Sequence, residues 1–482
     1  MGYPRRFFTE KIYMKSHVTD MTKGSPAKHL LLFSLPALVG NIFQQIYNLT
    51  DTIIVGRFVG AEALAAVGAT FSITFLFFAL CNGISSGGGI IVSQYYGAHD
   101  NDNVKRTIVN TGFIMLIVPI LFGSIGFVLA PYLLQLLSTP ESIIAASTMY
   151  VRFMCVGLLF TSLYNFFTAV LRALGDSKTP LYFLIISTII NVIFDVTFVY
   201  FFNLGIKGVA LATVIAQFIS ALSCGLYAYT KNPVFRIEKE FFTISSKIVA
   251  KIIKLGVPMS LQFGLIAISS MAVQRIVNSY GTVVVAAFAA TNRIEQFVHM
   301  PYTTLGMSLS TYCGQNFGAK KYDRVYTGYK KGLVMMAILS CVLLLVMQFF
   351  GGAITSLFVS EKEVIELGMM GLKLTSLFYF TLGMIYVVRG VLTGTGDAFF
   401  ALFNGVVEVI GRFTIPIILT SYLGMGPKGI WLSAGIVWAV SGVTAWLRYY
   451  FHFHRRYVGS NISFIEPSEQ PALFHKKAAA HN

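Results

Sequence analysis

The stretch IVNTGFIMLIVPILFGSIGFVLA, residues 108–130, contains no charged side chain. A helix that crosses the hydrocarbon core of a bilayer needs about 20 mostly apolar residues, so this segment is long enough to span it. About eleven other segments are also long and apolar enough to span a bilayer. Only 12% of the 482 residues are charged, although a soluble domain carries about a quarter. The composition therefore predicts an all-α integral membrane protein.

Twelve transmembrane helices are expected from these apolar segments. The expected spans are residues 29–55, 61–92, 107–130, 143–171, 179–203, 208–229, 249–278, 283–313, 328–350, 364–392, 398–421 and 428–451. They leave loops that alternate between the two sides of the membrane.

The basic residues show which side faces the cytoplasm. The net charge is +16, which by itself could indicate nucleic-acid binding. However, the lysines and arginines gather in the N-terminal arm, in the loops on the arm's side of the membrane and in the C-terminal tail, for example at Arg5, Arg6, Lys105, Lys321 and Lys477. By the positive-inside rule, both termini are expected in the cytoplasm. The charge is thus a signal of topology, and we expect no nucleic-acid partner.

The two halves of the chain resemble each other at an offset of 221 positions. Four separated clusters recur at this offset: Ala65-Ala66 with Ala286-Ala287, Gln94 and Gly97 with Gln315 and Gly318, Gly175-Asp176 with Gly396-Asp397, and Lys207-Gly208 with Lys428-Gly429. Only the first helix slips by one, since Pro36 matches Pro258. A repeat of this kind indicates a duplicated fold.

Because each half holds six expected spans, both halves enter the membrane in the same direction. This predicts a parallel repeat of two lobes around a central cavity, an arrangement known from transporters. The expected parts are a cytoplasmic arm (1–28), an N-lobe (29–229), a cytoplasmic linker (230–248), a C-lobe (249–453) and a cytoplasmic tail (454–482).

Acidic side chains within spans are costly and often mark function. Asp51 and Asp195 both fall in the outer halves of their helices, with Asn191 one turn from Asp195 and Thr213 at a similar depth. Carboxylate, amide and hydroxyl oxygens suit a hard cation such as Na⁺. Alternatively the carboxylates could hold a proton, since burial and like charges favour the neutral form. A third reading is a hydrogen-bonded cluster that only joins helices.

The second half carries a different set of charges. Glu408 and Arg412 are four residues apart in the favourable order for a helical ion pair. Glu295 lies near Arg293, so it could form an ion pair or bind a cationic substrate. For both acids a structural pair and a substrate or gating role remain open. We expect Arg389, near the inner end of its span, to extend its side chain to the membrane surface.

Several other classes of site find no support. The glycine-rich run at residues 83–89 is not followed by Gly-Lys-Ser/Thr, so it predicts close helix packing rather than phosphate binding. The five cysteines stand singly in apolar segments, and His299 has no ligand-spaced partner and is expected to be a core residue. We predict no enzyme and no cofactor. With no nucleotide-binding domain, an ion gradient should supply the energy.

The chain resembles the multidrug and toxic compound extrusion (MATE) family, bacterial branch, over residues 21–453. The resemblance rests on Gly24-Ser25-Pro26, Asn48-Leu49-Thr50-Asp51-Thr52, Gln94-Tyr95-Tyr96-Gly97-Ala98, Gly314-Gln315-Asn316-Phe317-Gly318-Ala319, the repeated Gly-Asp, and the pair Asn191 and Asp195. The order of these motifs within a parallel repeat of two six-helix halves is fairly specific.

The resemblance implies a multi-pass antiporter that exports small amphipathic organic cations in exchange for H⁺ or Na⁺. It implies a cation site in the first lobe, which would fall on Asp51, Asn191, Asp195 and Thr213, the positions already selected. It also implies that the protein lies in the bacterial cytoplasmic membrane, where lipid surrounds it. We expect a monomer. In the second lobe the chain departs from members that carry acids on helices 7 and 10.

Five residues remain candidates for substrate binding or gating in the second lobe: Glu295, Glu408, Arg412, Gln262 and Gln274. The competing hypothesis is a lipid-linked precursor flippase of the same superfamily. Such a flippase would need a strongly cationic cavity for a phosphorylated headgroup, whereas the basic residues within these spans are few and some lie near acids.

Overall fold

The computed structural model describes residues 17–458, and all its regular elements are helical. Our expectations for the arm before His17 and the tail after Val458 lie outside the described residues. The main helices are α1 (Pro26–Ile54), α2 (Ala61–Ala69), α3 (Phe71–Gly97), α4 (Asn101–Leu136), α5 (Glu141–Ala173), α6 (Lys178–Val196), α7 (Ile206–Lys231), α8 (Ser246–Asn278), α9 (Thr282–Gly318), α10 (Tyr322–Ser356), α11 (Lys362–Ser376), α12 (Tyr379–Gly394), α13 (Ala398–Ile417) and α14 (Lys428–Arg448).

Ten helices of the described chain are long and apolar enough to cross a membrane. Helices α11 and α12, which meet at a bend of 52°, are together long and apolar enough for an eleventh span. The predicted all-helical, multi-span fold is therefore confirmed. The remaining expected span corresponds to α9. Its 37 residues include Arg293 and Glu295, and it is not among the helices that are apolar enough to cross a membrane. The expected span 61–92 is divided, since α2 ends at Ala69 and α3 begins at Phe71.

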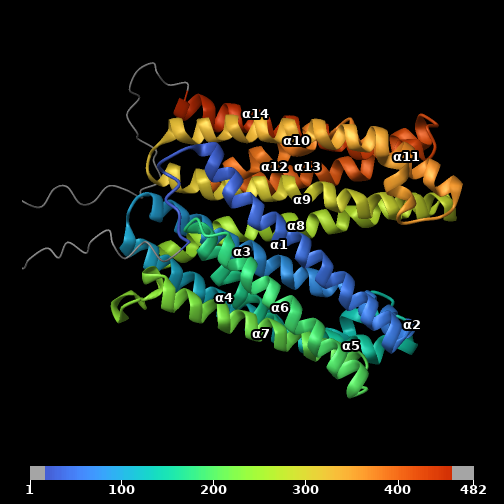
Figure 1. Cartoon of the computed structure of the whole chain (residues 1–482), viewed down its shortest axis with the longest axis horizontal. Coiled ribbons are helices and arrows are strands. Elements are labelled where there is room, and N and C mark those ends of the chain that lie inside the picture. The colour runs from blue at the N-terminus through green and yellow to red at the C-terminus, as the bar shows by residue number, and fades with distance from the viewer. Residues whose placement is uncertain (1–16, 459–482) are drawn as a thin grey trace, which may run out of the picture.

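The helices form two groups that lie side by side (Figure 1). In the first group α3, α4, α5, α6 and α7 pack together, and in the second α9, α10, α11, α12, α13 and α14 do so. The groups lie close at the end where the described chain starts and stops, here called the terminal side. They diverge toward the opposite end, where α2 and α11 lie (Figure 1).

The first helix of each half contacts both groups. Helix α1 packs against α6 of the first group and α9 of the second, while α8 packs against α3 and α13. Leu30 and Phe33 of α1 share a buried cluster with Tyr302 and Leu309 of α9. Because α1 and α8 bridge the groups, a movement of one group against the other must bend or tilt these two helices.

The glycine-rich run of α3 forms one of these bridging contacts. A Cβ atom added to Gly87 would lie 2.7 Å from the backbone nitrogen of Gly256 in α8. Ser260 of α8 donates a hydrogen bond to the Leu80 carbonyl at 3.0 Å. The small residues thus allow two helix backbones to approach closely, which confirms packing as the reason for the run.

On the terminal side, residues related by the repeat join the two groups. Gln94 of α3 donates to the Gly394 carbonyl at 2.9 Å, and Gln315 of α9 donates to the Ala173 carbonyl at 2.9 Å. The backbone of Gly97 lies against Gln315, and that of Gly318 lies against Gln94, so neither glycine has room for a side chain. This symmetric contact, the seam, closes the terminal side.

The structure also repeats at the level of local geometry. Helix α6 continues into a π-helical turn at Thr197–Phe201, and α13 continues into one at Ile418–Tyr422. The two turns start at positions 197 and 418, which are separated by the repeat offset of 221. Duplicated sequence has therefore produced duplicated backbone irregularities.

Candidate functional site

Helices α1 and α6 bring three of the predicted site residues together. Asn191 and Asp195 lie one turn apart on α6 and both are fully buried. With its amide oriented so that the nitrogen faces the acids, Asn191 donates to Asp51 Oδ1 at 2.8 Å and to Asp195 Oδ2 at 3.1 Å. One amide group therefore holds the two carboxyl groups side by side.

The cluster of acids has no cationic partner among the described residues. Within residues 17–458, neither Asp51 nor Asp195 forms an ion pair. The buried atoms Asp195 Oδ1 and Thr213 Oγ1 also have no hydrogen-bond partner there. A buried carboxylate without a counter-charge is costly. A proton or a small cation at this cluster would balance the charge of the two carboxyl groups.

Three more polar side chains that were not predicted from the sequence lie around the two acids. Tyr47 lies one turn before Asp51 on α1 and beside Thr213, and Tyr150 of α5 lies close to both acids. The Tyr47 hydroxyl and Gln217 Oε1 are buried without a partner among the described residues. Spacing could have revealed two of them, because Tyr47 precedes Asp51 by four positions and Gln217 follows Thr213 by four.

Both acids lie in the last helical turn before a π-helical segment. Asp51 precedes the π-helical turn Val55–Val59, and Asp195 precedes the π-helical turn Thr197–Phe201. Such turns interrupt the regular ladder of backbone hydrogen bonds and occur often at functional sites. The cluster thus sits where α1 and α6 are least regular.

In the second group of helices, Glu408 of α13 is the centre of a charged network. Its Oε1 is bound by the guanidinium of Arg389 on α12, while Arg412 Nη2 lies 4.0 Å from its Oε2. Our expectation for Arg389 was wrong: the side chain is largely buried and turns toward Glu408 rather than toward the membrane surface. Arg389 pairs with the buried carboxylate of Glu408 because a buried ion needs a counter-ion where water is absent.

Polar neighbours complete this network. Arg389 Nε donates to Asn404 Oδ1 at 2.7 Å, and Asn404 donates to the Ser441 carbonyl at 2.9 Å. Ser441 donates to Glu408 Oε1 at 3.2 Å, and Arg412 donates to Ser270 of α8 at 3.1 Å. The predicted pair of Glu408 and Arg412 is therefore the weaker half of a network that joins α12, α13, α14 and α8.

Glu295 of α9 is buried apart from this network. Its Oε1 accepts from Thr375 Oγ1 at 2.6 Å and from the Tyr379 hydroxyl at 3.1 Å, on either side of the bend between α11 and α12. Among the described residues it has no ion pair, so the pairing with Arg293 that we considered does not occur. Its Oε2 has no hydrogen-bond partner there.

The remaining candidates of the second half lie in different surroundings. Gln262 of α8 is buried near Gly405 of α13. Gln274 is exposed and donates to Asn278 on its own helix at 2.8 Å, so the structure does not place it with the other candidates. His299 is bound to the Tyr386 hydroxyl at 3.0 Å, which agrees with a core histidine.

Comparison with known proteins identifies the family. The MatE family model matches residues 36–197 and 258–418. The chain belongs to the MatE family of membrane transporters. The two matched segments begin at positions 36 and 258, which are 222 apart, as are Pro36 and Pro258 in the repeat. This MATE protein is therefore a multi-pass membrane transporter and not an enzyme.

Curated relatives cover nearly the whole MATE chain. It is 34% identical over 437 residues to "Probable multidrug resistance protein YpnP" of Bacillus subtilis, covering 89% of this chain and 96% of that protein. It is 29% identical over 445 residues to "Probable multidrug resistance protein YoeA" of the same organism, covering 91% and 96%.

Solved structures support the fold of this MATE protein. One structure described as an "outward-facing conformation of a multidrug resistance MATE family transporter" matches with a TM-score of 0.85 at 20% identity, covering 90% of this chain and 98% of that one. A structure described as that of a "MOP superfamily transporter from Pyrococcus furiosus" matches with a TM-score of 0.84 at 20% identity, covering 90% of this chain and 97% of that one. At this identity the match concerns the fold alone.

Proposed function

We propose that this protein is a secondary active exporter of small amphipathic organic cations, which it exchanges for H⁺ or Na⁺ by alternating access. The observation that carries the proposal is the buried cluster of Asp51, Asn191 and Asp195, which lacks a cationic partner within residues 17–458. The two Bacillus subtilis relatives, each named a probable multidrug resistance protein, agree with it.

The residues of the cluster fit either coupling ion. Na⁺ prefers oxygen ligands, and the carboxylates of Asp51 and Asp195, the hydroxyls of Tyr47 and Thr213, and Gln217 Oε1 offer them. A proton would suit two neighbouring carboxyl groups equally well, since one shared proton relieves their repulsion. In either case the ion supplies the counter-charge that the buried cluster lacks within residues 17–458.

Coupling follows if the ion and the substrate favour different conformations. The acids lie on α1 and α6, and α1 also packs against α9 of the other group. A change of charge at the cluster therefore acts on a helix that spans both groups. We take residues 29–229 and 249–453 as the two lobes and place the terminal side in the cytoplasm of a bacterial cell, with the protein as a monomer.

The test is efflux of a cationic dye from reconstituted vesicles. With a pH gradient or a Na⁺ gradient imposed separately, the wild type should move the dye under at least one of them. Asp51→Asn and Asp195→Asn should reduce this rate to that of empty vesicles. Asp102→Asn serves as a matched control, because Asp102 is exposed on the terminal side. Wild-type efflux by Asp51→Asn would overturn the site.

A lipid-linked precursor flippase is the alternative function, and the structure does not favour it. A phosphorylated headgroup would need uncommitted cations, whereas Arg389 is held by Glu408 and Asn404. If neither gradient drives accumulation of any cationic dye, the antiporter proposal loses to the flippase.

A further inference from the structure

Residues 19–24, here called the strap, cross the seam on the terminal side before α1 begins at Pro26. Toward the first group of helices, the Thr19 amide donates to the Leu174 carbonyl, which follows α5, at 3.1 Å. Toward the second group, the Met21 amide donates to Gln315 Oε1 of α9 at 2.9 Å. The strap is therefore attached to both sides of the contact that closes the terminal side.

The attachment to the second group consists of several bonds to backbone carbonyls of the strap. Arg324 of α10 donates to the Met21 carbonyl at 3.0 Å and to the Gly24 carbonyl at 3.1 Å. Lys321 donates to the Thr22 carbonyl at 3.0 Å, and Asn316 donates to the Met21 carbonyl at 3.1 Å. These donors bind the strap by its main chain, whatever its side chains.

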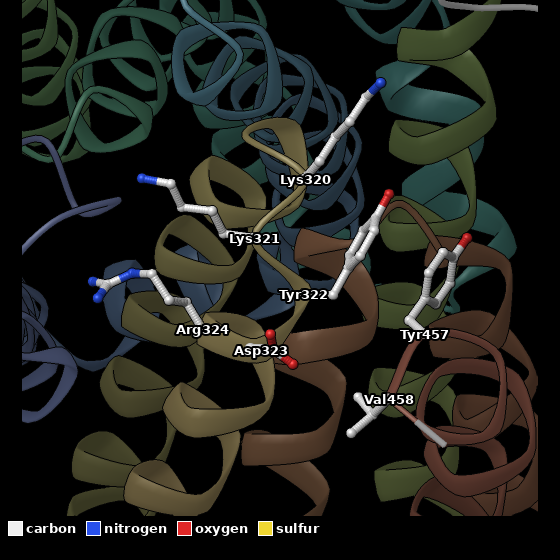
Figure 2. Close-up of a pocket in the computed structure, with 7 residues that line it drawn as sticks. All are labelled: Lys320, Lys321, Tyr322, Asp323, Arg324, Tyr457 and Val458. Carbon is white, nitrogen blue, oxygen red and sulfur yellow. The ribbon is translucent and has the colours of Figure 1, made fainter. Parts of the chain in front are cut away.

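Figure 2 shows the same arrangement from the side of the α9–α10 turn. Lys321 and Arg324 point away from Tyr322 and Tyr457, toward the dark blue N-terminal ribbon. The donors of the turn are thus directed at the strap, although both residues also line the pocket drawn in Figure 2.

Burial adds to these hydrogen bonds. Met21 is only 1% exposed and belongs to the buried cluster that includes Leu309, Tyr312 and Val325 of the second group. Thr22 is buried as well. The strap is therefore an integral layer of the second group, and its hydrogen bond through Thr19 connects that layer to the first.

Gln315 connects the strap to the seam itself. Its Oε1 accepts from Met21, while its Nε2 donates to the Ala173 carbonyl across the seam. Its repeat partner Gln94 makes the corresponding bond to Gly394. Opening the terminal side would break the hydrogen bonds of both glutamines across the seam. Because the strap is bonded to both groups, it would then have to detach from one of them.

The equivalent segment before α8 does not bridge in this way. The linker donates from the Ser245 amide to Asn110 of α4 at 2.8 Å, and Asn110 donates in return to the Thr243 carbonyl at 3.1 Å. Lys105 of α4 pairs with Glu238 at 2.5 Å. These bonds all attach the linker to α4, so the bridging role belongs to the N-terminal strap.

We propose that the strap is a latch that holds the terminal side closed, so that the strength of its two attachments sets the balance between the two access states. This inference rests on the alternating access in the proposed function. Weakening the attachment of the strap at either end, at Arg324 or at Thr19, favours the state that is open on the terminal side.

The experiment measures this balance directly, by the distance between spin labels on Asn101 and Arg455, which are exposed on the terminal side of the two groups. Arg324→Gln removes the donors to the strap from the second group. Thr19→Pro removes the amide that binds Leu174 in the first. Each should raise the ratio of long-distance to short-distance populations by about fivefold, the effect of losing one or two hydrogen bonds.

Arg236→Gln is the matched control. Arg236, in the linker after α7, also donates to two backbone carbonyls, those of Tyr229 and Thr230, but both belong to α7, the helix that directly precedes the linker. It should leave the distance distribution unchanged. If Arg324→Gln shifts the distribution and Thr19→Pro does not, Arg324 acts only within the α9–α10 turn and the latch is refuted. A lack of effect from both variants refutes it as well.

The readout needs neither dye nor ion gradient. A failure of the latch is therefore separate from a failure of dye efflux, which is measured in vesicles. Folding of each variant is checked by elution from a sizing column in detergent before labelling.

Discussion

At the scale of residues, the buried acids of this MATE protein are satisfied in opposite ways. Asp51 and Asp195 share one amide donor and have no cation within residues 17–458. Glu408, by contrast, is bound by one arginine and approached by a second. Removing one partner of a balanced buried pair is strongly destabilising, whereas an unbalanced carboxylate is available to bind an ion.

Removing Arg389 should therefore destabilise the protein more than removing Arg412. Arg389→Gln leaves Glu408 buried with only the more distant arginine, and breaking such a pair costs about 3 kcal/mol. Arg412→Gln should cost clearly less. The measurement is thermal unfolding of each purified variant in the same detergent.

A double-mutant cycle completes this test. Arg389→Gln combined with Glu408→Gln removes both charges, so it should be more stable than Arg389→Gln alone. A loss of stability in the double variant equal to the sum of the losses in the two single variants would show that the two side chains do not interact.

At the scale of elements, close contact between α3 and α9 depends on two glycines. Gly97 and Gly318 each face the backbone around the glutamine of the opposite helix, and each is the repeat partner of the other. Since helices in a membrane gain most from close packing of small residues, these two positions determine how closely the groups approach.

Gly97→Val and Gly318→Val should each destabilise the closed form, by about 1–3 kcal/mol, because the added atoms have no space. The matched control is Gly68→Ala in α2, where a Cβ atom would meet nothing within 4 Å. Proteolysis of the terminal-side loops reports the effect: faster cleavage is expected in both valine variants and an unchanged rate in Gly68→Ala.

At the scale of the whole molecule, the two groups meet on the terminal side and diverge at the other end (Figure 1). If transport requires the terminal side to open, fixing α3 to α9 must stop it. A Cβ atom added to Gly314 would lie 3.2 Å from Ser93 Cβ, near the separation of about 3.8 Å found in disulfides.

A Ser93→Cys, Gly314→Cys pair, in a chain whose five native cysteines are replaced, should therefore cross-link under oxidation. Dye efflux should cease in the oxidised protein and return with a reductant, while each single variant stays insensitive to oxidation. Undiminished efflux by the cross-linked protein would contradict alternating access at this seam.

Local chemistry explains what the sequence by itself determined. The length of each apolar segment predicts a span. Each helix in lipid must form its backbone hydrogen bonds within itself, so each span can be recognised from its own sequence. The repeat and the in-span acids are also visible in the sequence, since duplication preserves spacing and charge in lipid is rare. Asp51, Asn191 and Asp195 could therefore be selected before the structure showed them in contact.

Only the tertiary structure decided which partners these residues have. Arg389 meets Glu408 across two helices, Gln315 meets Ala173 from the other half, and the strap binds donors about 300 positions away. Sequence spacing reports neighbours on one helix, whereas these contacts depend on how helices cross. The physical reason is burial: without water, each charge and each backbone group must find its partner wherever packing places it.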